Sequence, residues 1–180
     1  MGERGPRGRY AKSDATRAEI LRVALEAYAR SGRQGPSLRS IAEAVGLSEA
    51  GVLHHFASKD HLLVAILEER DDDASRRYDL SDLEGNLSYI VETTRTPGLV
   101  KLFVDLTAAS ADPDHPAAAF MEEHRRRAEG RMLELLGPGH ERDAQLLVAA
   151  AEGLQIQWMR DPTVDIAAEL SRLFEVLQQN

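Results

Sequence analysis

The chain has 180 residues, no cysteine and few aromatic residues, and its 22 basic and 30 acidic side chains give a formal net charge of −8. The lack of cysteine excludes disulfides, thiolate metal sites and a cysteine nucleophile. No stretch approaches the roughly 18 apolar residues of a membrane span, and the Arg-rich N-terminus lacks the apolar run of a secretory signal, so we expect a cytoplasmic protein without membrane contact.

Residues 1–13 are predicted to form a flexible basic arm. Glycine and arginine dominate this segment, which carries a net charge of +3, whereas residues 14–60 are neutral and residues 61–180 carry −11. The acidic total argues against a nucleic-acid partner, but so uneven a distribution suggests that different parts of the chain have different tasks. The sequence leaves two interpretations of the arm open: it contacts DNA, for example through Arg9, or it is only a tail.

Residues 14–60 show the pattern of a three-helix domain. The expected helices span 14–30, 38–45 and 48–56. Ser37 and Ser48 stand at the starts of the second and third helices, where a serine hydroxyl can accept a hydrogen bond from a free backbone N–H. Gly46 lies between these two helices, where a sharp turn favours a left-handed residue.

Residues 61–180 are predicted to form a second, helical domain. Good helix formers dominate, strand-like alternation is scarce, and prolines stand near several expected helix starts. The expected helices span 58–78, 82–95, 97–111, 116–136, 139–159 and 163–178. The acidic run over 71–73 is interpreted as a solvated part of the first of them. The chain is therefore predicted to be all-α, with about nine helices, combining an N-terminal helix-turn-helix domain with a C-terminal ligand-binding and dimerisation domain.

Residues 38–56 have the arrangement of a helix-turn-helix motif. Ala42 is small where two short helices would cross, and four apolar residues would fill the space between them: Ile41, Val45, Leu47 and Val52. Such a unit places its second helix in the major groove of DNA, while the first helix crosses the backbone. The motif therefore indicates double-stranded DNA as a partner.

An ordered series of residues extends this motif on both sides, over about 48 residues. The series comprises Thr16-Arg17, Ile20-Leu21, Ala24, Gly32, Ser37, Ile41-Ala42, Val45-Gly46-Leu47-Ser48, His54, Phe56, Ser58-Lys59 and Leu62-Leu63. It resembles the DNA-binding domain of the TetR family of transcriptional regulators. The rest of the chain matches that family in architecture alone, since the family has a six-helix variable domain whose last two long helices pair into a dimer.

The resemblance implies a role for several residues in binding operator DNA. Ser37 and Ser48 would cap helices and bond phosphates. The residues implied to lie near base edges are Glu49, Ala50, Gly51 and His54, and those implied to contact the backbone are His55 and Lys59. The sequence departs from the family at Leu53 and His55, where tyrosines are usual. Leu53 would either touch a thymine methyl group or turn inward.

Several residues of the second domain are candidates for an effector pocket between its helices. They are Tyr89, Phe103, Phe120, Met121, His124, Gln155 and Trp158. The alternative for each is ordinary core packing. Gln155 and Trp158 carry the most weight, because they lie one helical turn apart and offer an aromatic wall beside an amide. The effector itself would be an unknown small molecule.

Neither a metal nor a catalytic site is expected. Residues His54, His55 and His61 lack a metal-ligand spacing, and residues 122–124 lack the carboxylate–imidazole step of a di-iron bundle. The sequence contains no P-loop, GxSxG or GxGxxG motif, so we expect no cofactor and no enzyme.

The last two expected helices carry apolar stripes with the spacing of a helix-bundle seam. The predicted dimer interface comprises Leu147, Ala150, Ala151, Leu154, Ile166, Leu170, Leu173, Phe174 and Leu177. A monomeric core would show similar stripes, so the dimer rests jointly on the stripes and the family resemblance.

Together these features predict a ligand-responsive DNA-binding transcriptional regulator, with repression as the expected direction. It would bind a partly palindromic operator as a homodimer and be released by a small-molecule effector. The alternative is a helical small-molecule-binding protein or enzyme whose helix-turn-helix is vestigial.

Overall fold

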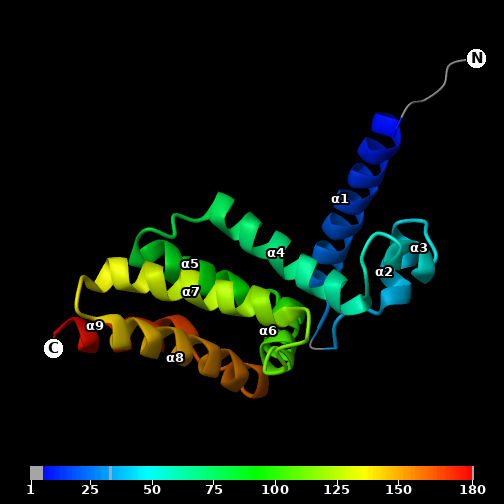
Figure 1. Cartoon of the computed structure of the whole chain (residues 1–180). Coiled ribbons are helices and arrows are strands. Elements are labelled where there is room, and N and C mark those ends of the chain that lie inside the picture. Colours follow the sequence, from blue (N-terminus) through cyan, green and yellow to red (C-terminus); the bar gives the residue numbers. More distant parts are fainter. Residues whose placement is uncertain (1–5, 33, 180) are drawn as a thin grey trace, which may run out of the picture.

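The computed structural model describes residues 6–32 and 34–179, with side chains from residue 13 onwards. Within these residues the chain forms nine α-helices and no strand, which confirms the predicted all-α fold. The helices are α1 (Pro6–Arg30), α2 (Leu38–Ala44), α3 (Glu49–Leu53), α4 (Lys59–Arg77), α5 (Leu83–Thr93), α6 (Pro97–Ala109), α7 (Ala117–Leu136), α8 (Glu141–Arg160) and α9 (Ile166–Gln178). Helices α1–α3, which we call the head, lie at one end, α5–α9 form the body, and α4 runs between them (Figure 1).

Helix α1 begins at Pro6, well before the start that the sequence predicts at Asp14. Proline suits the first position of a helix, because its fixed φ is helical and its missing N–H would have no partner within the helix. Residues 6–13 are thus helical, which corrects the flexible arm predicted over 1–13. Residues 1–5 of that arm lie outside the described part of the chain.

The two predicted serine caps are present in the helix-turn-helix. The Ser37 side chain accepts a hydrogen bond from the backbone N–H of Ser40, and that of Ser48 accepts one from Gly51, both at 3.0 Å. Gly46 adopts a φ of 68° in the turn between α2 and α3, a conformation that favours glycine. Local hydrogen bonding therefore sets the position of α3 relative to α2.

Helix α3 is shorter than the sequence predicts, since it ends at Leu53 instead of Phe56. After Leu53 the backbone tightens into three-residue turns. The N–H of His55 donates to the carbonyl of Val52 at 3.0 Å, and that of Phe56 donates to Leu53 at 3.2 Å. Such tightening satisfies the last free carbonyls of a helix when the chain must turn away.

One hydrophobic core joins the head to the body. It contains buried residues of α1–α4, of α6 and of the start of α7, including Ile20, Tyr28, Ile41, Val52, Phe56, Leu62, Ile66, Leu99, Phe103 and Phe120. The domain boundary that the sequence predicts at residue 60 therefore does not separate two cores. Because packed interiors resist deformation, a shift of α4 or α6 would be transmitted to the head.

Gly98, near the start of α6, packs against the end of α1. A Cβ atom at this position would lie 2.1 Å from Ser31 Oγ and 2.3 Å from the backbone oxygen of Tyr28. A backbone oxygen cannot rotate away as a side chain can, so only glycine fits here without a movement of one helix.

Replacing Gly98 with alanine is expected to lower the free energy of unfolding by about 1–3 kcal/mol, the usual cost of overpacking. Urea denaturation measures the change. Gly130→Ala is the matched control, because a Cβ there meets nothing within 4 Å and the substitution should stabilise helix α7 by about 0.5–1 kcal/mol. A Gly98→Ala variant as stable as the Gly130→Ala variant would contradict the close contact between α6 and α1.

Candidate functional site

The start of α3 forms an exposed polar surface on the head. Ser48, Glu49 and Ala50 are exposed, and Gly51 is half-buried. Val52 is fully buried in the head core. Because Val52 faces inward, Ala50, about half a turn away, points outward. Glu49 is exposed at the first position of the helix, so both residues are free to approach another molecule.

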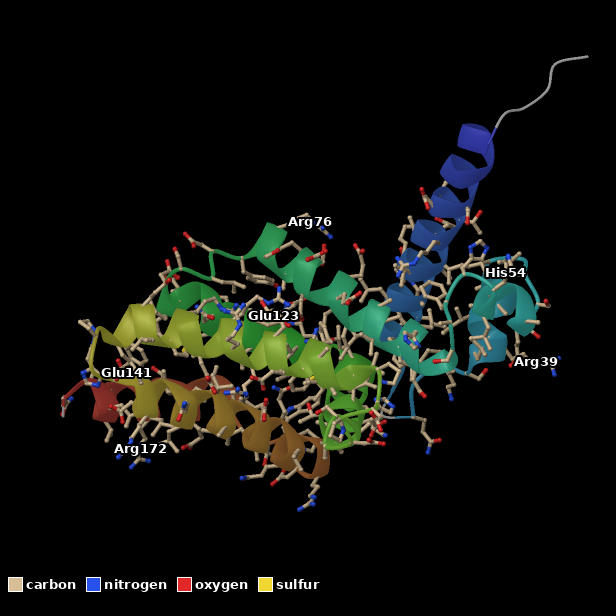
Figure 2. All side chains as sticks on the ribbon, in the orientation of Figure 1. Arg39, His54, Arg76, Glu123, Glu141 and Arg172 are labelled. Carbon is tan, nitrogen blue, oxygen red and sulfur yellow. The ribbon has the colours of Figure 1, made fainter. Side chains whose placement is uncertain are left out.

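The other residues predicted to contact DNA lie around α3. Ser37 and His54 are exposed, and the ring centre of His54 lies 5.8 Å from that of His55, which is half-buried. His54 and Arg39 lie on the head, and Arg172 lies at the opposite end of the molecule (Figure 2). Lys59 is exposed at the start of α4, and Leu53 is half-buried. Arg9 belongs to α1, but its side chain is outside those described.

Two further basic residues of the head were not among the predicted contacts. Arg17 is exposed on α1, and its guanidinium carbon lies 4.8 Å from the centre of the Phe56 ring, which places a positive charge just beyond α3. Arg39 has 77% of its side chain exposed and pairs with Glu43 at 2.8 Å. The sequence does contain a signal for Arg17: it lies three residues before the buried Ile20, which places it at the edge of the stripe of α1 that faces the core.

A cavity of about 120 Å³ is lined by residues of α4, α5, α7, α8 and α9. Phe103 of α6 also lines it. The polar side chains of its wall are Arg70, Asn86, Tyr89, Thr93, His124, Arg131, Glu152 and Gln155, and the remaining lining residues are apolar. A small cavity with a mostly apolar wall and a few polar groups has the character of a small-molecule site.

Four of the seven residues predicted for an effector pocket line this cavity: Tyr89, Phe103, His124 and Gln155. The other three are core residues instead. Phe120 and Met121 are buried in the core shared with the head, and Trp158 is buried in a separate cluster with Val100 and Ile166. Gln155 lines the cavity, whereas Trp158, one helical turn later, is not among its lining residues.

A buried ion pair on α4 joins the cavity wall to α7. The Nε and Nη2 atoms of Arg70 donate to Oδ1 of Asp71 at 3.0 and 2.7 Å, and Nδ1 of His124 donates to Oδ2 of Asp71 at 2.7 Å. Burial alone would raise the pKa of the Asp71 carboxyl, but the charge of Arg70 and the hydrogen bond from His124 outweigh it and hold that pKa well below its ordinary range. Asp71 is therefore an ionised carboxylate that fixes Arg70 and His124.

Replacing Asp71 with asparagine is expected to lower the free energy of unfolding at pH 7 by about 3 kcal/mol, because Arg70 would stay buried without its counter-charge. A lowered carboxyl pKa contributes stability that is fully present above the ordinary carboxyl pKa of about 4 and is lost as the pH falls below it. The natural chain should therefore lose stability more steeply than Asp71→Asn below about pH 4. Urea unfolding between pH 7 and pH 3 measures both effects.

Asp72→Asn provides the matched control, since Asp72 adjoins Asp71 but is exposed. Its effect should stay within about 0.5 kcal/mol. Equal effects of the two substitutions would show that the Arg70–Asp71–His124 contacts do not stabilise the fold.

The sequence analysis did not identify Arg70, Arg131 and Glu152 as residues of the cavity wall. Its interpretation of residues 71–73 as a solvated stretch is wrong for Asp71, because only 14% of the Asp71 side chain is exposed. Helical spacing in the sequence could have indicated that Arg70 faces the interior. Arg70 lies four residues after Ile66, and Ile66 is fully buried, so the two share one face of α4.

The predicted dimer residues lie mostly inside a single chain. The buried ones are Leu147, Ile166, Leu170, Phe174 and Leu177, and the half-buried ones are Ala150, Ala151, Leu154 and Leu173. They pack against the body's own helices α5, α6 and α7. The buried five have almost no surface left for a partner chain to cover, which corrects their assignment to an interface.

A different stripe of α8 faces outward. Leu146 and Ile156 are large apolar residues with 50% and 40% of their surface exposed. Ala149 is exposed between them, and a Cβ added at Gly153 would meet nothing within 4 Å. The four positions follow the three-four-three spacing of a helix-packing seam.

The residues from 6 to 179, apart from residue 33, contain no group of three or more His, Asp or Glu side chains that could hold a metal ion. None of the described helices is long and apolar enough to pass through a membrane.

The N-terminal part of the chain is similar to known regulators. Residues 20–66 match the model of the family described as bacterial regulatory proteins, tetR family. The HTH-type transcriptional repressor AcnR of Corynebacterium diphtheriae is 32% identical over 92 residues, which cover 51% of this chain and 40% of the relative. AcnR of Corynebacterium glutamicum is 37% identical over 65 residues, or 36% of this chain and 33% of the relative. The chain thus spans less than half the length of these curated relatives.

Nearly the whole fold is similar to solved structures. The crystal structure of a tetR-family transcriptional regulator from Streptomyces coelicolor has a TM-score of 0.67 at 21% identity, covering 91% of this chain and 79% of that one. A TetR transcriptional regulator from Rhodococcus sp. RHA1 has a TM-score of 0.65 at 20% identity, covering 92% and 98%. Such low identities show a shared fold, in which a helix-turn-helix head precedes a helical body.

Proposed function

We propose that the chain is a cytoplasmic DNA-binding transcriptional repressor of the TetR family, whose model its residues 20–66 match. The exposed start of α3 carries the proposal, because Glu49 and Ala50 are exposed in the capped first turn of a helix that the buried Val52 anchors to the head. The names of the curated relatives support repression as the direction of regulation.

We propose that α3 enters the major groove of operator DNA. Glu49, Ala50, Gly51 and His54 would lie near base edges, where Glu49 can accept from a cytosine amino group. The residues proposed to contact phosphates are Ser37, Ser48, His55, Lys59 and Arg17, to which Arg9 is added if the start of α1 reaches the duplex. Phosphate contacts position the head, and base contacts select the sequence.

The operator is proposed to be partly palindromic because the protein would bind it as a homodimer. The outward stripe of α8, with Leu146 and Ile156 exposed and small residues between them, supports a two-fold contact between two copies of this helix. Two heads would then reach half-sites about one helical turn, or ~34–36 Å, apart, or a multiple of that distance.

The cavity of the body is proposed to hold the effector that releases the protein from DNA. Arg70 links the two functions, because its side chain lines the cavity and its helix, α4, belongs to the core of the head. An effector that fits better when α4 is displaced would stabilise a dimer whose heads no longer match the two half-sites. This is a population shift, and it requires tighter binding to the DNA-incompetent state.

Selection from random duplex DNA at low salt tests the proposal. The full chain is incubated with a random-sequence library, bound duplexes are recovered and amplified over several rounds, and the products are sequenced. The proposal predicts enrichment of an inverted repeat, which we call the selected operator. Failure to enrich any such site would contradict it and would favour a helical small-molecule-binding protein or enzyme with a vestigial helix-turn-helix.

A further inference from the structure

The side chain of Arg131 of α7 lines the cavity and carries a buried hydrogen-bond donor. Its Nε atom is shielded from solvent and has no hydrogen-bond acceptor among the described residues, and the side chain lines the cavity. A buried guanidinium N–H without an acceptor is costly, and a guanidinium stays protonated in proteins. A ligand that carries an acceptor at this point would therefore be stabilised by the arginine.

The other charged groups of the cavity wall do not compete for that role. Both the Nε and Nη2 atoms of Arg70 donate to Asp71, and the second oxygen of Asp71 accepts from His124. Burial raises the pKa of the Glu152 carboxyl, although the charges of His124 and Arg125 act in the opposite direction, so Glu152 takes up a proton more readily than an exposed glutamate. Burial lowers the pKa of Arg131, although the charges of Asp71 and Glu134 act in the opposite direction, and its buried Nε–H is left without an acceptor.

The rest of the wall sets the shape and size of the ligand. Apolar side chains line most of it, among them Leu87, Ile90, Phe103, Val148 and Phe174. An apolar cavity of about 150 Å³ holds benzene, and the cavity here measures about 120 Å³. The space suits one ring or a short branched chain.

We propose that the cavity binds a small monocarboxylate whose carboxylate accepts hydrogen bonds from the Nε–Nη edge of Arg131. Guanidinium and carboxylate groups match in this two-point geometry, which an ammonium group cannot reproduce. The body of the ligand, a single aromatic ring or a short branched chain, packs against the apolar wall. The proposal rests on the proposed function, because it names the chemical class of the effector for the same cavity.

Titration of the full chain without DNA tests the ligand class. The probes are benzoate and 3-methylbutanoate, their neutral amides, and benzylamine as the cationic counterpart. We expect at least one carboxylate to raise the midpoint of thermal unfolding with increasing concentration, as any ligand specific to the folded state does. The amides and the amine should not. Binding of benzylamine alone, or of none of the probes, would overturn the proposal.

Two variants of α7 separate the role of Arg131 from a general effect of charge. Arg131→Met should weaken carboxylate binding by about tenfold or more, because it removes both hydrogen bonds. Arg127→Met is the matched control, since Arg127 lies one turn earlier, pairs with Glu123 and does not line this cavity; it should leave the affinity unchanged. Equal affinities in the two variants would overturn the assignment.

Arg131→Lys covers the case in which the methionine variant does not fold. Lysine keeps the charge but loses the planar edge, so it should also weaken carboxylate binding, and an affinity equal to that of the natural chain would overturn the proposal. These titrations contain no DNA, so their failure leaves the selection experiment unaffected. Conversely, a failed selection would contradict the regulator and leave the ligand class intact.

Discussion

Replacing Ala50 with glutamate is expected to lower the affinity for the selected operator by about a hundredfold or more while leaving the fold intact. Ala50 is exposed in the first turn of α3, next to Glu49. A second carboxylate would bring another negative charge toward the phosphates, and such like-charge contacts cost several kcal/mol of binding free energy. Each loss of about 1.4 kcal/mol lowers the affinity tenfold. A dimer would carry the change at both half-sites. Fluorescence anisotropy with a labelled duplex measures the loss.

Ala108→Glu is the matched control for this substitution. Ala108 is an exposed alanine of α6, in the body of the protein, so the same charge is added away from the head. Its operator affinity should equal that of the natural chain, and both variants should unfold within about 0.5 kcal/mol of it. Unchanged binding by the Ala50→Glu variant would mean that α3 does not face the DNA.

Replacing Ile156 with aspartate is expected to raise the dimer dissociation constant by about a hundredfold or more. Ile156 ends the outward stripe of α8, and in a dimer the new carboxylate would be buried without a partner. Sedimentation at micromolar concentration should then show a mass near 19.9 kDa for the variant and twice that mass for the natural chain. Operator affinity should fall as well, because a monomer reaches one half-site only.

Val91→Asp tests whether the effect belongs to α8. Val91 is also a large apolar residue with 43% of its surface exposed, but it lies on α5. The variant should sediment as a dimer and bind the selected operator normally. A dimer of unchanged stability in the Ile156→Asp variant would exclude the outward stripe of α8 as the interface.

The helices and the head were accessible from the sequence because local signals determine them. Serine caps, a left-handed Gly46 and the buried Ile41 and Val52 act over a few residues, and each is present in the structure. The early start of α1 at Pro6 was missed because the glycine and arginine content of the segment suggested a tail. Proline at a helix start is a weaker signal than that composition.

The cavity and the interface were harder to predict because they depend on how helices pack. Stripes such as Ile166, Leu170, Phe174 and Leu177 look the same whether they face a partner chain or the chain's own core. Charged residues inside a polar run, such as Arg70 and Asp71 on α4, become cavity-lining or buried only through the packing of other helices, which here brings His124 of α7 to Asp71. That pairing depends on the tertiary arrangement and has no local signature.

Methylation interference on the selected operator shows directly whether two copies of α3 read the major groove. Methylation of guanine N7 blocks the major groove without changing the backbone charge. We expect bound complexes to be depleted of DNA methylated at guanines in two symmetric half-sites, about one helical turn or a multiple of it apart. Binding that is indifferent to guanine N7 methylation, or sensitive within one half-site only, would contradict a dimer that reads the major groove with two copies of α3.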